Sequence, residues 1–226
     1  AESNTETGNL IKEENRRQVL LEKAREITKN PILISVDADE IFSSEILNPE
    51  YFDQIKNLEP GEGFTCSFKE LWFSNNYYRG EAKSEWAGRK LPCIWRDNFT
   101  NYLSGNRHEN RIPNIKVKHL DLPLIHFARV VPNRYWSRIR YYILFDILKN
   151  NMTDWKINYF YSVCWREEGM QLKECPKYWF KEWKKIDKDF LHFTDEEQNW
   201  FITESISLFS NHDYNLWKEA DIFDFN

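Results

Sequence analysis

The first pattern along the chain is helical and the second is extended. Residues 12–29 repeat apolar side chains at the i, i+4, i+7 spacing of one helix face, namely Leu20, Ala24 and Ile27. Asn30-Pro31 ends this pattern, because the residue before a proline disfavours helical geometry. The next run, Ile32–Val36, is apolar and β-branched, which predicts a strand buried on both faces of an α/β sheet.

The middle of the chain predicts short strands and the last third predicts helices. A short helix with Pro49 in its first turn is expected over residues 46–58. Alternation and short apolar runs predict strands over 64–68, 91–96, 115–118 and 122–127. Helical spacing returns over 132–149, after Pro176, and after the capping box Thr194–Glu197. We therefore expect an α/β domain over residues 1–149 and a helical extension over 150–226 packed on it.

Composition narrows the class of protein. The 226 residues include 31 basic and 36 acidic side chains, so no excess of cations favours nucleic-acid binding. Only 7 glycines are present, and neither common glycine-rich phosphate motif occurs. The H-E-x-x-H and G-x-S-x-G motifs of metalloproteases and hydrolases are also missing.

No apolar run approaches the roughly 18 residues that a membrane-spanning helix needs, and the first nine residues are too polar for a signal peptide. The four cysteines contain no C-x-x-C pair, which favours reduced, buried thiols and a cytoplasmic protein.

An acidic cluster, Asp37-Ala38-Asp39-Glu40, follows the strand predicted at Ile32–Val36. Open α/β sheets bind ligands at the carboxyl ends of their strands. Two carboxylates two residues apart can face one divalent cation, which leaves positions for water and the oxygens of a nucleoside diphosphate. Such an ion also acts as a Lewis acid on the leaving phosphate. The alternative is an acidic turn that caps the next helix.

The segment ILISVDADEIF, residues 32–42, resembles the D-x-D segment of the family 2 type of GT-A glycosyltransferases. Further segments resemble the family in the same order, namely Glu2–Gly8, Asn15-Arg16-Arg17, Trp95-Arg96-Asp97, Tyr102–Glu109 and Pro123–Phe127. The resemblance extends over about residues 1–145. It implies a GT-A-like, Rossmann-related mixed sheet flanked by helices.

The family begins with a strand, a helix and a second strand that bind the nucleotide base, and this chain starts where that second strand ends. We therefore expect that a missing N-terminal segment or a second chain completes the donor site. The third possibility is that the resemblance is misleading.

The resemblance implies a role for several side chains. The metal ligands are Asp37, Asp39 and His126, holding Mn²⁺ or Mg²⁺. The donor-binding residues are Asp37, Asn15, Arg16 and Arg96. Arg96, Arg107 and Arg129 are candidates to offset diphosphate charge, since guanidinium matches phosphate oxygens. A core role for His126 and solvated positions for the arginines are the alternatives.

Inverting transfer of a sugar needs a base that deprotonates the acceptor hydroxyl, and a carboxylate within hydrogen-bond reach can serve. Glu109 is the first candidate and Asp97 the second, with a surface loop acid as the alternative for each.

Aromatic residues make up 16% of the chain, and they divide by pattern. Four tryptophans follow helical apolar faces and are expected in the core: Trp136, Trp179, Trp183 and Trp200. Trp72, Tyr78 and Trp86 follow no helical face. Because aromatic rings stack on sugars, we expect these three to contact the acceptor.

Three functions remain open from the sequence. The first is a metal-dependent glycosyltransferase that moves a sugar from a nucleotide-sugar donor to a glycan or other hydroxyl acceptor. The second is a non-catalytic relative that binds a glycan or a partner protein. The third is a D-x-D phosphatase with an aspartyl nucleophile, although Glu40-Ile41 replaces the residues that usually follow that motif.

Overall fold

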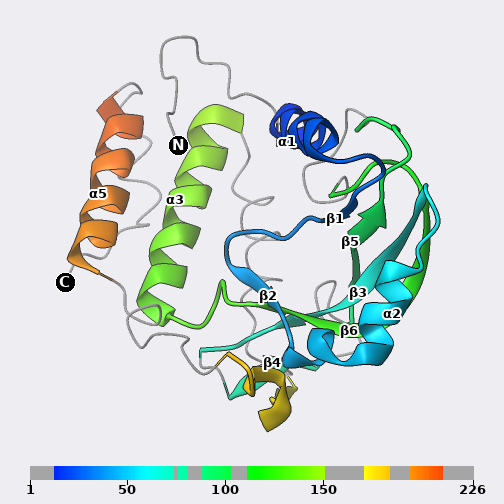
Figure 1. Cartoon of the computed structure of the whole chain (residues 1–226). Coiled ribbons are helices and arrows are strands. Elements are labelled where there is room, and N and C mark those ends of the chain that lie inside the picture. The colour runs from blue at the N-terminus through cyan, green and yellow to red at the C-terminus, as the bar shows by residue number, and fades with distance from the viewer. Residues whose placement is uncertain are drawn as a thin grey trace. The chain divides into compact units, whose positions relative to one another are not determined.

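The protein is an α/β structure with a mixed, curled sheet (Figure 1). The computed structural model describes residues 13–73, 76–80, 88–102, 111–150, 171–183 and 194–210. Two compact units divide the chain. The first contains residues 1–69, 82–126 and 176–184, and the second contains residues 70–81, 127–175 and 185–226. This division differs from the boundary expected after residue 149, because the second unit contains residues from before and from after that position.

The first unit contains the main sheet. Its strands lie in the order β1 (Ile32–Ile34), β5 (Lys90–Arg96), β3 (Glu62–Glu70), β6 (Lys116–His126) and β2 (Glu40–Phe42). The pairs β1/β5, β3/β5 and β2/β6 are antiparallel. Strands β3 and β6 are parallel, because the residue numbers of their contacts rise along both strands. Thr65 bonds to Lys118, and Ser67 bonds to Asp121. The sheet is therefore mixed, as expected.

Alternation along β3 builds the core of the first unit. Phe64, Cys66 and Phe68 are buried, whereas Thr65 and Ser67 between them are only partly buried. Helix α2 (Pro49–Lys56) follows the 3-10 helix η1 (Ser44–Leu47) and adds Ile55 to the same core. Its N-terminus agrees with the sequence, since Pro49 begins the helix and Asn48 accepts a hydrogen bond from the Glu50 backbone N–H.

Two cysteines lie in this core. Cys66 and Cys93 are free thiols with no exposed surface, as expected. A hydrogen bond with Cys93, together with burial, raises the pKa of the Cys66 thiol. The Cys66 thiol therefore remains neutral, and both buried side chains act as small apolar groups.

Helix α1 (Glu13–Ile27) forms where the sequence predicts, but its predicted apolar face is wrong. Leu20 and Ile27 are 69% and 85% exposed, and the helix is anchored by Leu21, which packs with Trp95 and Ile112. Three further partly buried positions of the helix are polar and make hydrogen bonds or ion pairs, namely Arg17, Gln18 and Arg25.

Strand β1 is also less buried than predicted. It is the edge of the described sheet, and Ile32 and Ile34 are 36% and 50% exposed. The opposite face carries Leu33, which packs against the Leu21 cluster. Only one of the two faces is covered within the described part of the chain, so the prediction of burial on both faces is wrong.

The second unit pairs helix α3 (Pro132–Asn150) with helix α5 (Asp195–Ser210), and strand β4 (Tyr77–Arg79) with strand β7 (Leu172–Glu174). Both helices were expected, and both short strands were missed. The helix expected after Pro176 begins as the 3-10 helix η2 (Lys177–Phe180), which belongs to the first unit, and residues 184–193 of that prediction lie outside the described ones. Across the described residues, no helix has the length and apolar character needed to cross a membrane.

The capping box of α5 is present, because Thr194 and Glu197 exchange hydrogen bonds at 3.1 and 3.2 Å. We predict that Thr194→Ala lowers the free energy of unfolding by about 1 kcal/mol in urea titrations. Thr203→Ala, at an exposed position inside the same helix, is the matched control and should change it by less than about 0.7 kcal/mol. Equal effects of the two substitutions would contradict a role for the cap.

Candidate functional site

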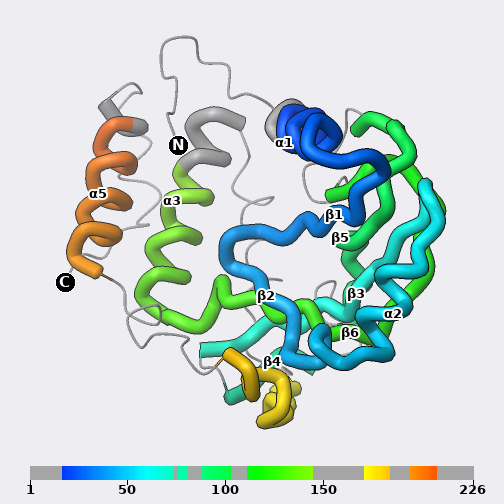
Figure 2. Tube along the Cα trace, in the orientation of Figure 1, coloured from blue at the N-terminus to red at the C-terminus, as the bar shows by residue number. Residues whose placement is uncertain are grey.

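The acidic cluster forms a closed turn between β1 and β2. Figure 2 shows the chain leaving β1 and turning into β2. The Glu40 backbone N–H donates to the Asp37 carbonyl at 3.0 Å, and the Asp37 backbone N–H donates to the Glu40 carboxylate at 2.9 Å. The side chain of Glu40 thus satisfies the backbone at the start of its own turn.

Arg111 binds the first and last acid of this turn. Its guanidinium contacts Glu40 through two hydrogen bonds, Nη1 to Oε2 at 2.6 Å and Nη2 to Oε1 at 2.8 Å. Nη2 also donates to Asp37 Oδ2 at 2.8 Å. The Glu40 side chain is fully buried and that of Arg111 is 7% exposed. Burial lowers the pKa of Arg111, but the hydrogen bond and charge of Glu40, with the charge of Asp37, outweigh it and leave that pKa raised.

A second arginine reaches Asp37 from helix α1. Arg17 Nη2 lies 3.5 Å from Asp37 Oδ1, so each oxygen of this carboxylate faces a guanidinium. The Asp37 side chain is nevertheless 44% exposed. It can still accept a hydrogen bond from a ligand, but its charge is offset by two cations.

Asp39 and His126 lie together. His126 Nε2 is 3.3 Å from Asp39 Oδ2, and the side chains are 18% and 36% exposed, respectively. His126 ends β6 and stands opposite Glu40 in the β2/β6 register. The ring centroids of His126 and the buried Phe68 are 5.1 Å apart, and this packing supports the orientation of the imidazole.

Two of the three expected metal ligands are therefore adjacent. One carboxylate oxygen and one imidazole nitrogen at a partly exposed position suit a divalent ion that completes its coordination with water and phosphate oxygens. Among the residues that the structure describes, no group of three or more His, Cys, Asp and Glu side chains is close enough to hold a metal ion.

Asp97 has a different environment from the one expected of a base. Arg25 binds both of its oxygens at 2.8 Å, the Phe99 backbone N–H donates to one of them, and the residue is 1% exposed. The hydrogen bonding that Arg25 donates to Asp97 raises the pKa of Arg25 despite partial burial. This carboxylate is occupied and shielded from an acceptor hydroxyl. Glu109, the first candidate, lies outside the described residues.

Of the four predicted donor-binding residues, the structure describes the side chains of Asp37 and Arg96. Arg96 donates from Nη1 to the Leu58 carbonyl at 2.9 Å, which ties β5 to the end of α2. Arg107 and the side chains of Asn15 and Arg16 lie outside the described part. Asp37 alone of this set lies in the turn.

Two of the predicted acceptor residues, Trp72 and Tyr78, belong to the second unit. Trp72 is 6% exposed, with the guanidinium carbons of Arg129 and Arg79 4.7 and 5.2 Å from its ring centroid. Both arginines bind the buried carboxylate of Glu70, at 2.8 and 3.4 Å. Trp72 therefore presents little ring face to a sugar, and Arg129 is engaged in a buried ion pair.

Tyr78 lies partly buried in β4, opposite Lys173 of β7. Trp86 is outside the described residues.

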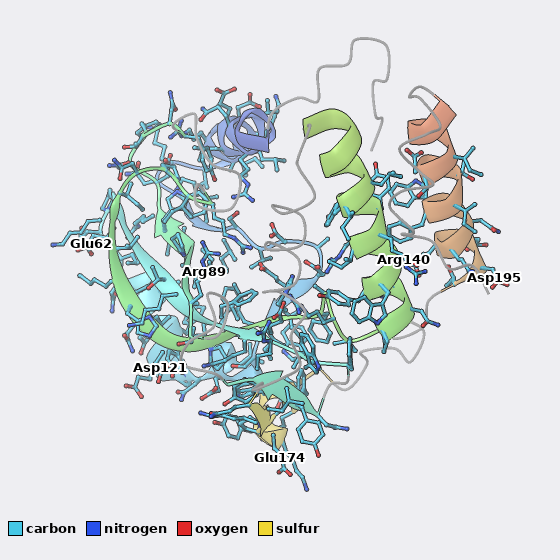
Figure 3. The ribbon with its side chains drawn as sticks, turned by 180° about the vertical axis from the view of Figure 1, so that it is seen from behind. Glu62, Arg89, Asp121, Arg140, Glu174 and Asp195 are labelled. Carbon is cyan, nitrogen blue, oxygen red and sulfur yellow. The ribbon has the colours of Figure 1, made fainter. Side chains whose placement is uncertain are left out.

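A serine, a histidine and an aspartate also occur together on β3 and β6. Figure 3 labels Asp121, the acid of this cluster, which lies on β6. Ser67 Oγ donates to Asp121 at 3.1 Å and lies 3.4 Å from His119 Nε2. The acid binds the serine instead of orienting the histidine, so this cluster is not a nucleophilic triad.

Sequence reasoning missed Arg111, Arg17 and the buried role of Glu40. The available signal was the density of acid in the turn, which requires cations nearby, but nothing in the sequence says which arginine supplies them.

Comparisons with family models, with curated proteins and with solved structures find no match to this chain. The assignment of the candidate site therefore rests on the geometry of its residues.

We predict that Asp97→Asn lowers the free energy of unfolding by about 3 kcal/mol, because it leaves the Arg25 guanidinium without its charged partner. Glu26→Gln, which breaks the exposed Lys23–Glu26 pair on the same helix, should lower it by less than about 1 kcal/mol. Urea denaturation followed by circular dichroism measures both. A wild-type free energy of unfolding for Asp97→Asn would show that this pair is not structural.

Proposed function

We propose that the protein is a divalent-metal-dependent glycosyltransferase that uses a nucleotide-sugar donor and a glycan or other hydroxyl acceptor. The observation that carries the proposal is the 3.3 Å contact between Asp39 and His126, where Asp39 lies in the turn between β1 and β2. A carboxylate and an imidazole meet there beside a strand end, where α/β sheets bind ligands. The resemblance of this turn to the D-x-D segment of GT-A enzymes supports the same assignment.

In this proposal Asp39 and His126 hold the ion, Mn²⁺ or Mg²⁺. When bound, the ion offsets the charge that develops on the leaving nucleoside diphosphate. Asp37 keeps an exposed edge through which it accepts a hydrogen bond from the donor. Glu109 stays the candidate base that takes the proton of the acceptor hydroxyl as the new glycosidic bond forms.

A binding protein without turnover is the second candidate. The environment of Asp97 favours it, because one of the two candidate bases is bound by Arg25 on both oxygens. Such a protein would bind a glycan, or a nucleotide with its ion, and release it unchanged.

We predict that Mn²⁺ produces binding heat with UDP, GDP or CDP sugars in calorimetry of the natural full-length protein, and that Asp39→Asn abolishes this heat. The physical reason is the loss of one of two protein ligands together with its charge. Asp53→Asn, which removes an exposed carboxylate on α2 of the same unit, is the matched control and should leave binding unchanged.

The absence of metal-dependent heat for all three donors in the wild-type protein would refute the proposed function. Metal-dependent binding without release of nucleoside diphosphate, measured over hours with hydroxyl acceptors, would favour the non-catalytic candidate.

A further inference from the structure

We propose that Arg111 is a positioning residue for the Asp39–His126 pair, acting through Glu40 and Asp37 without touching the ion or the donor. The inference depends on the proposed function for its consequence in metal binding. Its structural basis, the closure of the turn, can be tested without any metal.

Arg111 compensates the negative charge of the turn. Residues 37–40 contain three carboxylates within four positions, and one of them, Glu40, is fully buried. An ionised carboxylate inside a protein is tolerated only when it is paired and hydrogen-bonded. Arg111 supplies two short hydrogen bonds to it and a third to Asp37, so one cation compensates both ends of the turn.

The same bonds determine where the two ligands lie. Oε2 of Glu40 accepts both Nη1 of Arg111 and the backbone N–H of Asp37, so the guanidinium holds the carboxylate in the position that closes the turn. Asp39 lies inside that closed turn. Glu40 is also the register partner of His126 across β2 and β6, so fixing Glu40 fixes the backbone of both ligands relative to each other.

The planar fork is essential to this role. Arg111 bridges two carboxylates with three hydrogen bonds of defined direction, and a lysine ammonium at the same place provides charge without that geometry. Groups that orient metal ligands from behind typically change metal affinity by about 10- to 100-fold when they are removed. We therefore expect metal affinity to fall by this factor when the guanidinium is replaced by a group that keeps the charge but not the geometry.

The experiment compares the wild type with Arg111→Lys in the full-length protein, with Arg25→Lys as the matched control. Arg25 is also an inward-facing arginine that binds a buried acid through two hydrogen bonds in the same unit, but its partner is Asp97 and not the turn. Three quantities are measured: the melting temperature, the amide hydrogen exchange of residues 36–42 without metal, and Mn²⁺ affinity with its electron paramagnetic resonance spectrum.

We expect Arg111→Lys to speed exchange at the Glu40 amide, to weaken Mn²⁺ binding by about 10-fold or more, and to change the spectrum of the bound ion. Arg25→Lys should lower the melting temperature and leave the exchange of the turn and the Mn²⁺ affinity unchanged. Wild-type exchange and affinity in a folded Arg111→Lys protein would overturn the inference.

A double variant covers the case in which Arg111→Lys does not fold. Glu40→Leu with Arg111→Met replaces the buried pair by apolar side chains of similar size, a change that proteins often tolerate. It should fold, and it should still show fast exchange and weak Mn²⁺ binding. Tight Mn²⁺ binding by this variant would contradict a positioning role.

Failure of the proposed function gives a different result. If the wild type binds no Mn²⁺ with any nucleotide sugar, the transferase proposal falls, and the exchange of residues 36–42 alone decides the role of Arg111. Faster exchange in Arg111→Lys but not in Arg25→Lys then supports the inference, and equal exchange overturns it.

Discussion

The buried ion pair between Arg111 and Glu40 is the interaction on which the arrangement of the candidate site depends. A fully buried carboxylate at the first residue of β2 would destabilise the strand if it had no partner. With Arg111 in place, the same carboxylate closes the turn before β2, and β2 aligns with β6. Asp39 and His126 then meet at 3.3 Å, although they are far apart in the sequence.

The same physical rule recurs elsewhere in the molecule. Asp97 is 1% exposed and bound by Arg25, and in the second unit Glu70 is 4% exposed and bound by Arg79 and Arg129. Each of these inward-facing acids therefore has an arginine that can form directed hydrogen bonds. Burial sorts the acids into two groups: Glu40, Glu70 and Asp97 are buried and paired with arginine, whereas Asp37 and Asp39 are partly exposed.

This sorting changes the interpretation of the acidic and aromatic residues that the sequence brought forward. Asp97 and Arg129, candidates for base and phosphate contact, are engaged in buried ion pairs. Trp72, a candidate for sugar stacking, lies against two guanidinium groups and packs against Phe73, with ring centroids 4.9 Å apart. Among the described residues, the candidate site thus consists of the turn, Arg17, Arg111 and His126, all in the first unit.

Local patterns were sufficient for much of the fold. The alternation of Phe64, Cys66 and Phe68, the proline at the start of α2 and the capping box of α5 all predicted elements that the structure contains, because each depends on neighbours within a few residues. The short β4 and β7 escaped prediction, since three residues carry too little periodicity. The buried face of α1 was also misjudged, because its inward side chains are mostly polar and find their partners elsewhere in the chain.

The sequence by itself determined that a strand begins at Ile32 and that acidic residues follow it; the strand was predicted to reach Val36 and ends at Ile34. The resemblance also made Asp39 and His126 candidate ligands. Only the tertiary structure decided which acids are buried against arginine. Arg111 lies 71 residues from Glu40, and Arg25 lies 72 residues from Asp97. Charge compensation acts through space and not along the chain, so no local pattern could assign these partners.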